Sequence, residues 1–311
     1  MELSLILLNK LAVMFLFMGI GLILYKTKKI TMQGNKELAT ILIYVILPST
    51  ILSSFITEFT YEKLIGLIIS FLAAAAALLI SILISRLVFG NRYKIEHFGT
   101  AFSNAGFMGI PLVKAVADGL GCTENTAVFY LTSFVALLNI LQWTYGVYIM
   151  SGNKDVISPK KIVTNPVVIA GVIGLLLFVT SIPVPLILTD SLAMVGNMTA
   201  PVAMITLGVY LAETPFFDIF RSKSAYVSAL VRLLLIPAVT MILLSFLPTE
   251  FNSIKMIVLI AASAPVGSNV AIFAQLNHLN YSQAVKIICL STILCIITMP
   301  VMIAVAGLIW N

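Results

Sequence analysis

Hydrophobic residues fill ten long segments of the chain, and polar or charged residues gather in the short stretches between them. Runs such as 64–88 and 284–308 reach or exceed the roughly 20 residues that an α-helix needs to cross the hydrocarbon layer of a bilayer. The pattern therefore predicts an all-α integral membrane protein with ten transmembrane helices. The predicted spans are 3–24, 38–57, 64–88, 97–117, 126–150, 166–181, 190–212, 225–247, 255–275 and 284–308.

The composition excludes a water-soluble domain. The chain is 60% hydrophobic and 10% charged, whereas an ordinary soluble domain is roughly a quarter charged. No basic leader with a small-residue cleavage site precedes the first segment, so we expect it to be a retained helix. Three cysteines, Cys122, Cys289 and Cys295, match neither a metal-type pair nor an even disulfide set, and we expect ordinary packing roles for them.

Basic residues are distributed unevenly between the two sets of connectors. One set holds only Lys63 and Lys255. Because lysine and arginine near span ends are retained in the cytoplasm, the richer set should be cytoplasmic and both termini should lie on the other side. These single charges do not form a patch typical of nucleic-acid binding. The richer set is Lys26, Lys28, Lys29, Lys36, Arg86, Arg92, Lys94, Lys154, Lys160, Lys161, Arg221, Lys223 and Lys286.

The longest polar connector, 151–165, divides the chain into two groups of five predicted helices, 1–150 and 166–311. Pro48 and Pro201 lie 153 residues apart in the second span of each half, and Pro111 and Pro265 lie 154 apart in the fourth. Five is an odd number, so equivalent halves would have opposite orientations. We therefore predict two inverted five-helix repeats joined by a cytoplasmic connector.

The fourth and ninth spans carry signals for a broken helix. Pro111 lacks the N–H that bonds four residues back, and Gly106 lowers the cost of irregular dihedrals. The ninth span has Pro265 followed by Gly267. Paired interruptions in repeated halves are a sequence pointer to a transporter site, although kinks in two packed helices remain an alternative.

A break of this kind suits an anion, because the second half-helix begins inside the protein with free N–H groups and a positive dipole end. Neutral side chains beside the breaks can add hydrogen-bond donors without burying a cation. These are Ser103, Asn104, Ser268 and Asn269.

Polar residues elsewhere in the spans are further candidates. Asn139, Gln142 and Tyr145 form a stripe at i, i+3 and i+6 on the fifth span that faces either the cavity or a neighbouring helix. Lys114 follows the break at Pro111 by about one turn and is a candidate ligand, with snorkelling as the alternative. For Lys10 and Arg232 we expect snorkelling or a structural pair.

Three motifs resemble the auxin efflux carrier family, which includes bacterial malate and malonate permeases. They are Asn-Ala-Gly-Phe-Met-Gly-Ile-Pro at 104–111, Lys-Lys-Ile-Val-Thr-Asn-Pro-Val-Val-Ile at 160–169 and Ala-Pro-Val-Ala-Met-Ile-Thr-Leu-Gly at 200–208. The resemblance covers nearly the whole chain. It implies a scaffold domain, a transport domain with crossing broken helices four and nine, and a carboxylate site at the crossover.

By motif match, Asn104 and Pro111 take the fourth-helix role, and Pro265 with Asn269 the ninth-helix role. The plant carriers have a more polar, proline-bearing crossover and a long central loop. In this chain the corresponding crossover region contains Gly106, and the central connector is short. Auxin itself is therefore not the expected substrate.

The sequence thus predicts a secondary transporter of a small organic anion, embedded in cell-membrane lipid, with no cofactor, metal or catalytic residue. Coupling to H⁺ or Na⁺ and assembly into a homodimer stay open. A cation or proton antiporter would need carboxylates at mid-depth, whereas Asp118, Asp155, Asp190 and Asp218 fall near span ends or in loops. A ligand sensor that does not transport remains the other alternative.

Overall fold

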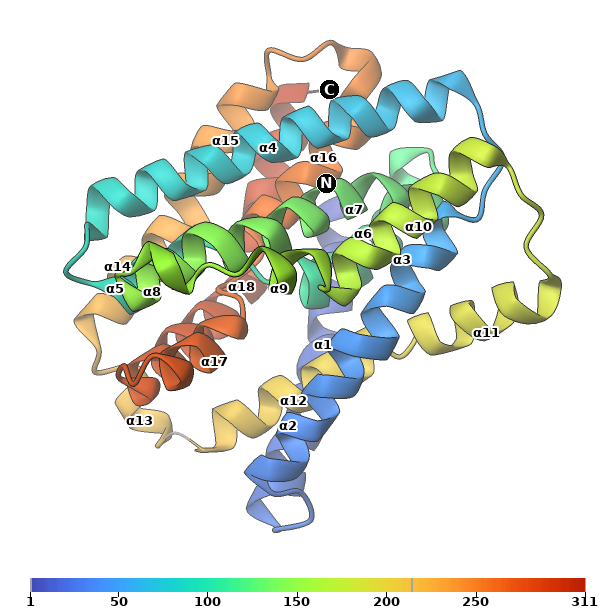
Figure 1. Cartoon of the computed structure of the whole chain (residues 1–311). Helices are drawn as coiled ribbons and strands as arrows, with labels where there is room; N and C mark the ends of the chain where they lie inside the picture. The colour runs from blue at the N-terminus through green and yellow to red at the C-terminus, as the bar shows by residue number, and fades with distance from the viewer. Residues whose placement is uncertain (1, 214, 311) are drawn as a thin grey trace.

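A computed structural model of the chain describes residues 2–213 and 215–310, and Figure 1 shows them as a bundle of helices. Within these ranges the chain forms helices and connecting turns, with one isolated antiparallel β-bridge between Ser103 and Val266. Residues 1 and 311, the outer limits of the predicted repeats, lie outside the described residues.

The first half of the chain runs through nine α-helices interspersed with short π and 3₁₀ segments. They are α1 (Glu2–Lys26), α2 (Met32–Ile41), η1 (Leu42–Ile46), α3 (Leu47–Phe55), α4 (Tyr61–Phe89), α5 (Lys94–Ala101), η2 (Ala105–Gly109), α6 (Ile110–Val116), η3 (Asp118–Leu120), α7 (Glu124–Leu141), η4 (Gln142–Gly146), α8 (Val147–Ser151), η5 (Lys154–Val156) and α9 (Pro159–Val163).

The second half continues with the same mixture of long and short helices. They are α10 (Pro166–Thr180), α11 (Leu186–Gly196), α12 (Thr199–Glu213), α13 (Phe216–Ile219), α14 (Lys223–Leu230), η6 (Val231–Leu235), α15 (Ile236–Leu244), η7 (Thr249–Phe251), α16 (Asn252–Ser263), α17 (Asn269–Leu276) and α18 (Tyr281–Trp310).

Seven helices among the described residues are long and apolar enough to cross a membrane: Glu2–Lys26, Met32–Phe55, Tyr61–Phe89, Glu124–Ser151, Leu186–Glu213, Lys223–Leu244 and Tyr281–Trp310. Each coincides with one of the ten predicted spans. The other three predicted spans are shorter pieces, because α10 has only 15 residues and the fourth and ninth spans are interrupted. The all-helical membrane class is confirmed.

Close backbone contacts join helices from the two halves. α1 packs along α12, and α10 packs along α3; Figure 1 shows α1, α2 and α12 together in the lower half of the view. A Cβ atom added at Gly208 would lie 2.0 Å from the carbonyl oxygen of Met18, and one at Gly21 would lie 2.1 Å from that of Ile205. Glycine is therefore required where α1 and α12 cross.

Three of the four π segments precede a proline. Pro48, Pro111 and Pro237 each lie in the first turn of the α-helix that follows η1, η2 and η6. A proline has no N–H to bond the carbonyl four residues back and its ring collides with that carbonyl. The wider π turn accommodates this mismatch without ending the helix.

The start of α1 and the end of α18 lie at the same end of the bundle. Gly119 lies against Leu3, and the carbonyl oxygen of Leu120 accepts a 2.7 Å hydrogen bond from Ser253. The neighbouring Asn252 donates a 2.8 Å hydrogen bond to the carbonyl oxygen of Trp310. The start of α1 and the end of α18 are thus connected through η3 and α16.

Candidate functional site

Two interrupted helices cross at the centre of the site. α5 ends at Ala101 and the chain becomes extended at Phe102, while α16 ends at Ser263 and becomes extended at Ala264. The backbone N–H of Asn104 donates to the carbonyl oxygen of Pro265 at 2.7 Å, and that of Gly267 donates to Phe102 at 3.1 Å. These two bonds hold the breaks together and form the isolated bridge.

The first break lies earlier in the chain than its proline suggests. The non-helical stretch covers residues 102–104, whereas Pro111 lies in the first turn of α6. The expectation that Pro111 itself interrupts the helix is therefore wrong, since η2 absorbs its missing hydrogen bond. Pro265 does lie inside the second break, where its carbonyl oxygen serves as an acceptor.

A cavity of about 340 Å³ opens beside this crossover. Seven of the ten candidate site residues line it: Ser103, Asn104, Gly106, Asn139, Gln142, Ser268 and Asn269. The remaining lining is mostly apolar and aromatic, with Ile43, Tyr44, Leu47, Phe107, Leu138, Trp143, Val167, Ile272 and Phe273 among its members. Concave, mostly apolar cavities with a few convergent polar groups are typical small-molecule sites.

Two helix N-termini border the cavity without a side-chain cap. Asn104 occupies the cap position of η2, and Ser268 that of α17, yet neither side chain accepts a hydrogen bond from its own helix. The first N–H groups of a helix have no partner within the helix. They also carry the positive end of its dipole. At α17 the N–H groups of Val270 and Ala271 already bond the carbonyl oxygens of Gly267 and Ser268, so this terminus contributes mainly the field of its dipole.

The Asn104 side chain is buried and has an unused donor. Its residue is only 4% exposed, and Nδ2 has no hydrogen-bond partner among the described residues. The hydroxyl of Ser103 is unpartnered in the same way. Leaving such groups unsatisfied costs about 1–3 kcal/mol each, so an acceptor in the cavity would recover part of this cost.

Two further asparagines that line the cavity already use their side-chain donors. Asn269 donates through Nδ2 to Oε1 of Gln142 at 2.8 Å, which ties the ninth-span break to η4. Asn139 donates to the carbonyl oxygen of Val135 on its own helix at 2.8 Å. Of the three asparagines at positions 104, 139 and 269, Asn104 is thus the one whose side-chain donor has no partner among the described residues.

The central connector supplies lining residues that the sequence reasoning did not select. Lys161, Thr164 and Asn165 all face this cavity, and Lys161 Nζ lies 5.9 Å from the ring centroid of Trp143. Lys161 is the only cation among the lining residues that the structure describes. The motif at 160–169 contains all three connector residues. The family resemblance therefore pointed to this segment, whereas the periodicity of hydrophobic residues did not.

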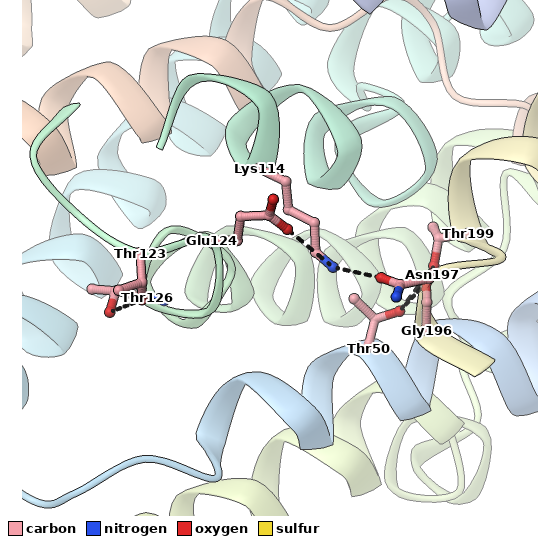
Figure 2. A network of polar contacts seen from close by, with 8 residues as sticks. All are labelled: Thr50, Lys114, Thr123, Glu124, Thr126, Gly196, Asn197 and Thr199. Carbon is pink, nitrogen blue, oxygen red and sulfur yellow. Dashed lines mark hydrogen bonds and ion pairs between the residues drawn. The ribbon is translucent and has the colours of Figure 1, made fainter. Parts of the chain in front are cut away.

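Lys114 lies outside the cavity lining, in a separate polar network. Its Nζ donates to Oδ1 of Asn197 at 3.3 Å and lies 4.0 Å from Glu124 Oε2. Figure 2 shows Lys114 reaching from α6 between these two partners. Next to them, Thr50 bonds both the carbonyl oxygen of Gly196, at 3.1 Å, and the hydroxyl of Thr199, at 2.8 Å. Lys114 thus connects α6 to the α11–α12 junction.

Arg232 does not snorkel to the membrane surface. The residue is 1% exposed and lies in η6, where its guanidinium contacts Ser81, Thr100 and Ala262. Of the two expectations for this residue, snorkelling or a structural pair, snorkelling is therefore wrong. Its partners are carbonyl and hydroxyl oxygens of other helices, which hydropathy along one segment cannot reveal.

Within 2–213 and 215–310 there is no group of three or more His, Cys, Asp or Glu side chains that could hold a metal ion.

Comparison with known protein families identifies the family of the chain. A family model described as "Membrane transport protein" matches residues 6–303, which is nearly the whole chain. No curated protein matches the chain. Because this match spans nearly the whole chain, we conclude that the chain belongs to the auxin efflux carrier family of membrane transport proteins.

Proposed function

We propose that the chain is a secondary transporter of a small organic anion, most simply a carboxylate, that binds at the crossover. The observation that carries this proposal is the buried, unpartnered amide of Asn104 beside two uncapped helix N-termini in one cavity. A carboxylate would supply an acceptor oxygen for the Asn104 amide and for those N–H groups of the two termini that are not already bonded.

The charges around the cavity favour an anion over a cation. Each helix N-terminus acts as roughly half a positive charge, and Lys161 stands at the connector side of the cavity. No aspartate or glutamate occurs among the described residues of the lining. A cation or proton antiporter would need such a group at the site, so we favour the anion.

The contacts between the halves support two inverted five-helix repeats. α1 is the first predicted span of the first half and packs on α12, the second span of the other half. α10, the first span of the second half, packs in the same manner on α3. Gly21 and Gly174, 153 residues apart in the sequence, lie in these two equivalent contacts, against Ile205 and Phe55.

Ten spans also agree with the position of the chain ends. Contacts through Gly119, Leu120 and Asn252 bring the start of α1 and the end of α18 to one end of the bundle. An even number of crossings requires this arrangement. With the positive-inside bias, we place that end outside the cytoplasm and the protein in the cell membrane.

The transport cycle we propose is alternating access about the crossover. The cavity reaches connector residues Lys161 and Asn165, so this conformation is the one open to the cytoplasm. On the opposite side, Lys114 joins α6 to Asn197. Opening the outer side would require this contact to break as the crossing helices move relative to α1, α3, α10 and α12.

Flux into liposomes tests the proposal. The purified protein is reconstituted, and uptake of labelled acetate, lactate, malonate and malate is compared with that of an amine of similar size, with and without imposed Na⁺ and pH gradients. We expect saturable uptake of at least one carboxylate and none of the amine. Amine uptake without any carboxylate uptake would refute the anion assignment, and binding without flux would favour a sensor.

A further inference from the structure

Arg232 is a formal charge buried in the membrane-spanning part of the protein without a carboxylate partner. The ion pairs that the described residues form involve Lys114 with Glu124 and Arg221 with Asp218. Arg232 is among the largest fully buried side chains of the chain. A guanidinium does not lose its proton in proteins, so the charge persists. Such a charge is expensive in a membrane and is retained for a function.

The position of Arg232 is defined by both broken helices. One Nη donates to the carbonyl oxygen of Thr100 at 3.0 Å, and the other donates to that of Ala262. Thr100 is the residue before the last of α5, and Ala262 holds the same place in α16. A third bond, 2.8 Å long, goes to the hydroxyl of Ser81 on α4. The arginine therefore bridges the C-terminal ends of the two half-helices.

Helix dipoles alone leave the crossover without a net charge. Two C-terminal ends and two N-terminal ends meet there, and each end is equivalent to roughly half an elementary charge of its sign. The two negative ends and the two positive ends therefore cancel. Arg232 adds one full positive charge at the negative ends, which leaves the positive N-terminal ends beside the cavity uncompensated.

We propose that Arg232 sets the anion selectivity of the crossover site: without touching the substrate, it cancels the negative ends of α5 and α16. Arg232 is then a positioning and specificity-determining residue. The inference rests on the proposed transport of a carboxylate and adds the group responsible for the charge preference. Arg232 lies on η6, the π segment that precedes Pro237.

Two independent variants remove or neutralise the charge of Arg232. Arg232→Met deletes it, while Ser81→Asp keeps the arginine and places a carboxylate where Arg232 now bonds a hydroxyl. Ser81→Asn is the matched neutral control. Lys255→Met is a second control, because Lys255 is also buried but bonds the carbonyl oxygen of Leu247 away from the crossover. Arg232→Lys keeps the charge with fewer donors.

The quantity compared between variants is the preference of the site for the acid over its amide, expressed as a ratio. For the carboxylate that the wild type takes up best, inhibition of uptake is measured with the unlabelled acid and with the same molecule carrying a carboxamide in place of one carboxylate. We expect Arg232→Met and Ser81→Asp each to lower the preference for the acid about tenfold, equal to about 1.4 kcal/mol. Arg232→Lys, Ser81→Asn and Lys255→Met should retain it.

The alternative outcomes are distinct. If both charge-removing variants weaken acid and amide equally and leave the ratio unchanged, Arg232 is only a brace and the inference is wrong. If Arg232→Met does not fold, Ser81→Asp against Ser81→Asn decides. If the wild type transports no carboxylate, the proposed function fails, and the selectivity role of Arg232 is overturned with it.

Discussion

The backbone N–H of Asn104 donates a 2.7 Å hydrogen bond to the carbonyl oxygen of Pro265. This bond uses the main chain of Asn104 to join the two breaks and leaves its side-chain amide buried and unpartnered. A Cβ atom at Gly267 would lie 3.2 Å from the carbonyl oxygen of Ser103, so the two segments approach closely at this glycine. Asn104 therefore joins the two breaks through its main chain and is the residue we propose to bind the ligand through its side chain.

Replacing Asn104 should weaken substrate affinity while leaving folding largely intact. A hydrogen bond to a charged group is worth about 1.5–3 kcal/mol, so Asn104→Ala should lower affinity roughly tenfold to a hundredfold. Asn104→Asp should be worse, because a carboxylate there repels the anion or requires protonation. The measurement is substrate affinity together with thermal stability.

Asn139→Ala is the matched control, since that amide lines the same cavity but donates to Val135 on its own helix. Its effect on affinity should be much smaller. Unchanged affinity in Asn104→Ala, combined with a large loss of stability, would show that Asn104 is a helix brace.

The α1–α12 contact should not tolerate a methyl group at Gly208. The added Cβ would collide with the main chain of Met18, and overpacking typically costs about 1–3 kcal/mol. Gly208→Ala should therefore lower the thermal denaturation temperature of the purified protein. Gly19→Ala on α1, where no atom lies within 4 Å of the added Cβ, should be neutral or stabilising. Equal effects of the two changes would contradict the packing described for this contact.

Weakening the Lys114–Asn197 contact should favour the conformation open to the outside. Asn197→Ala removes the acceptor of Lys114, and losing a hydrogen bond worth about 0.5–1.5 kcal/mol shifts a two-state equilibrium about twofold to tenfold. A cysteine at Asn139, in a Cys122→Ser background, should react faster with an impermeant thiol reagent added outside. Thr126→Ala, which loses only the local 2.9 Å bond to Thr123, should not change that rate. A slower or unchanged rate in Asn197→Ala would contradict this role.

The orientation of the chain can be tested by labelling single cysteines. With ten spans, a cysteine at Asn153 in the connector should react only from the cytoplasmic side, and one at Asn311 only from outside. The basis is the uneven distribution of lysine and arginine between the connectors. Reaction of both positions from one side would show that the number of crossings is wrong.

The sequence was sufficient to predict long apolar helices and the two interruptions, because both depend on local properties. Segment length and hydropathy locate the spans, and glycine with proline weakens the helix at 103–111 and 264–269. The exact break was harder to predict. A proline is tolerated in the first turn of a helix, so Pro111 alone cannot show whether the chain breaks at it or before it.

The rest of the site depends on contacts between distant segments. Lys161 and Asn165 belong to a polar connector, and nothing in their spacing predicts that they reach the cavity. The partners of Arg232 come from α4, α5 and α16, and its burial follows from packing that hydropathy cannot show. The π segments also contribute residues to the cavity wall. Tyr44, Phe107 and Trp143 line the cavity from η1, η2 and η4.

Counterflow in proteoliposomes tests the central claim most directly. Vesicles are loaded with an unlabelled carboxylate at high concentration, and uptake of a trace amount of the labelled form is followed from outside. In a carrier that alternates about one crossover site, the abundant internal carboxylate occupies the inward-open site and delays the exit of label, so we predict a transient accumulation of label above its equilibrium level. This accumulation should be reduced in Asn104→Ala at the same external concentration. Label that only equilibrates, with a rate independent of the internal carboxylate, would contradict alternating access.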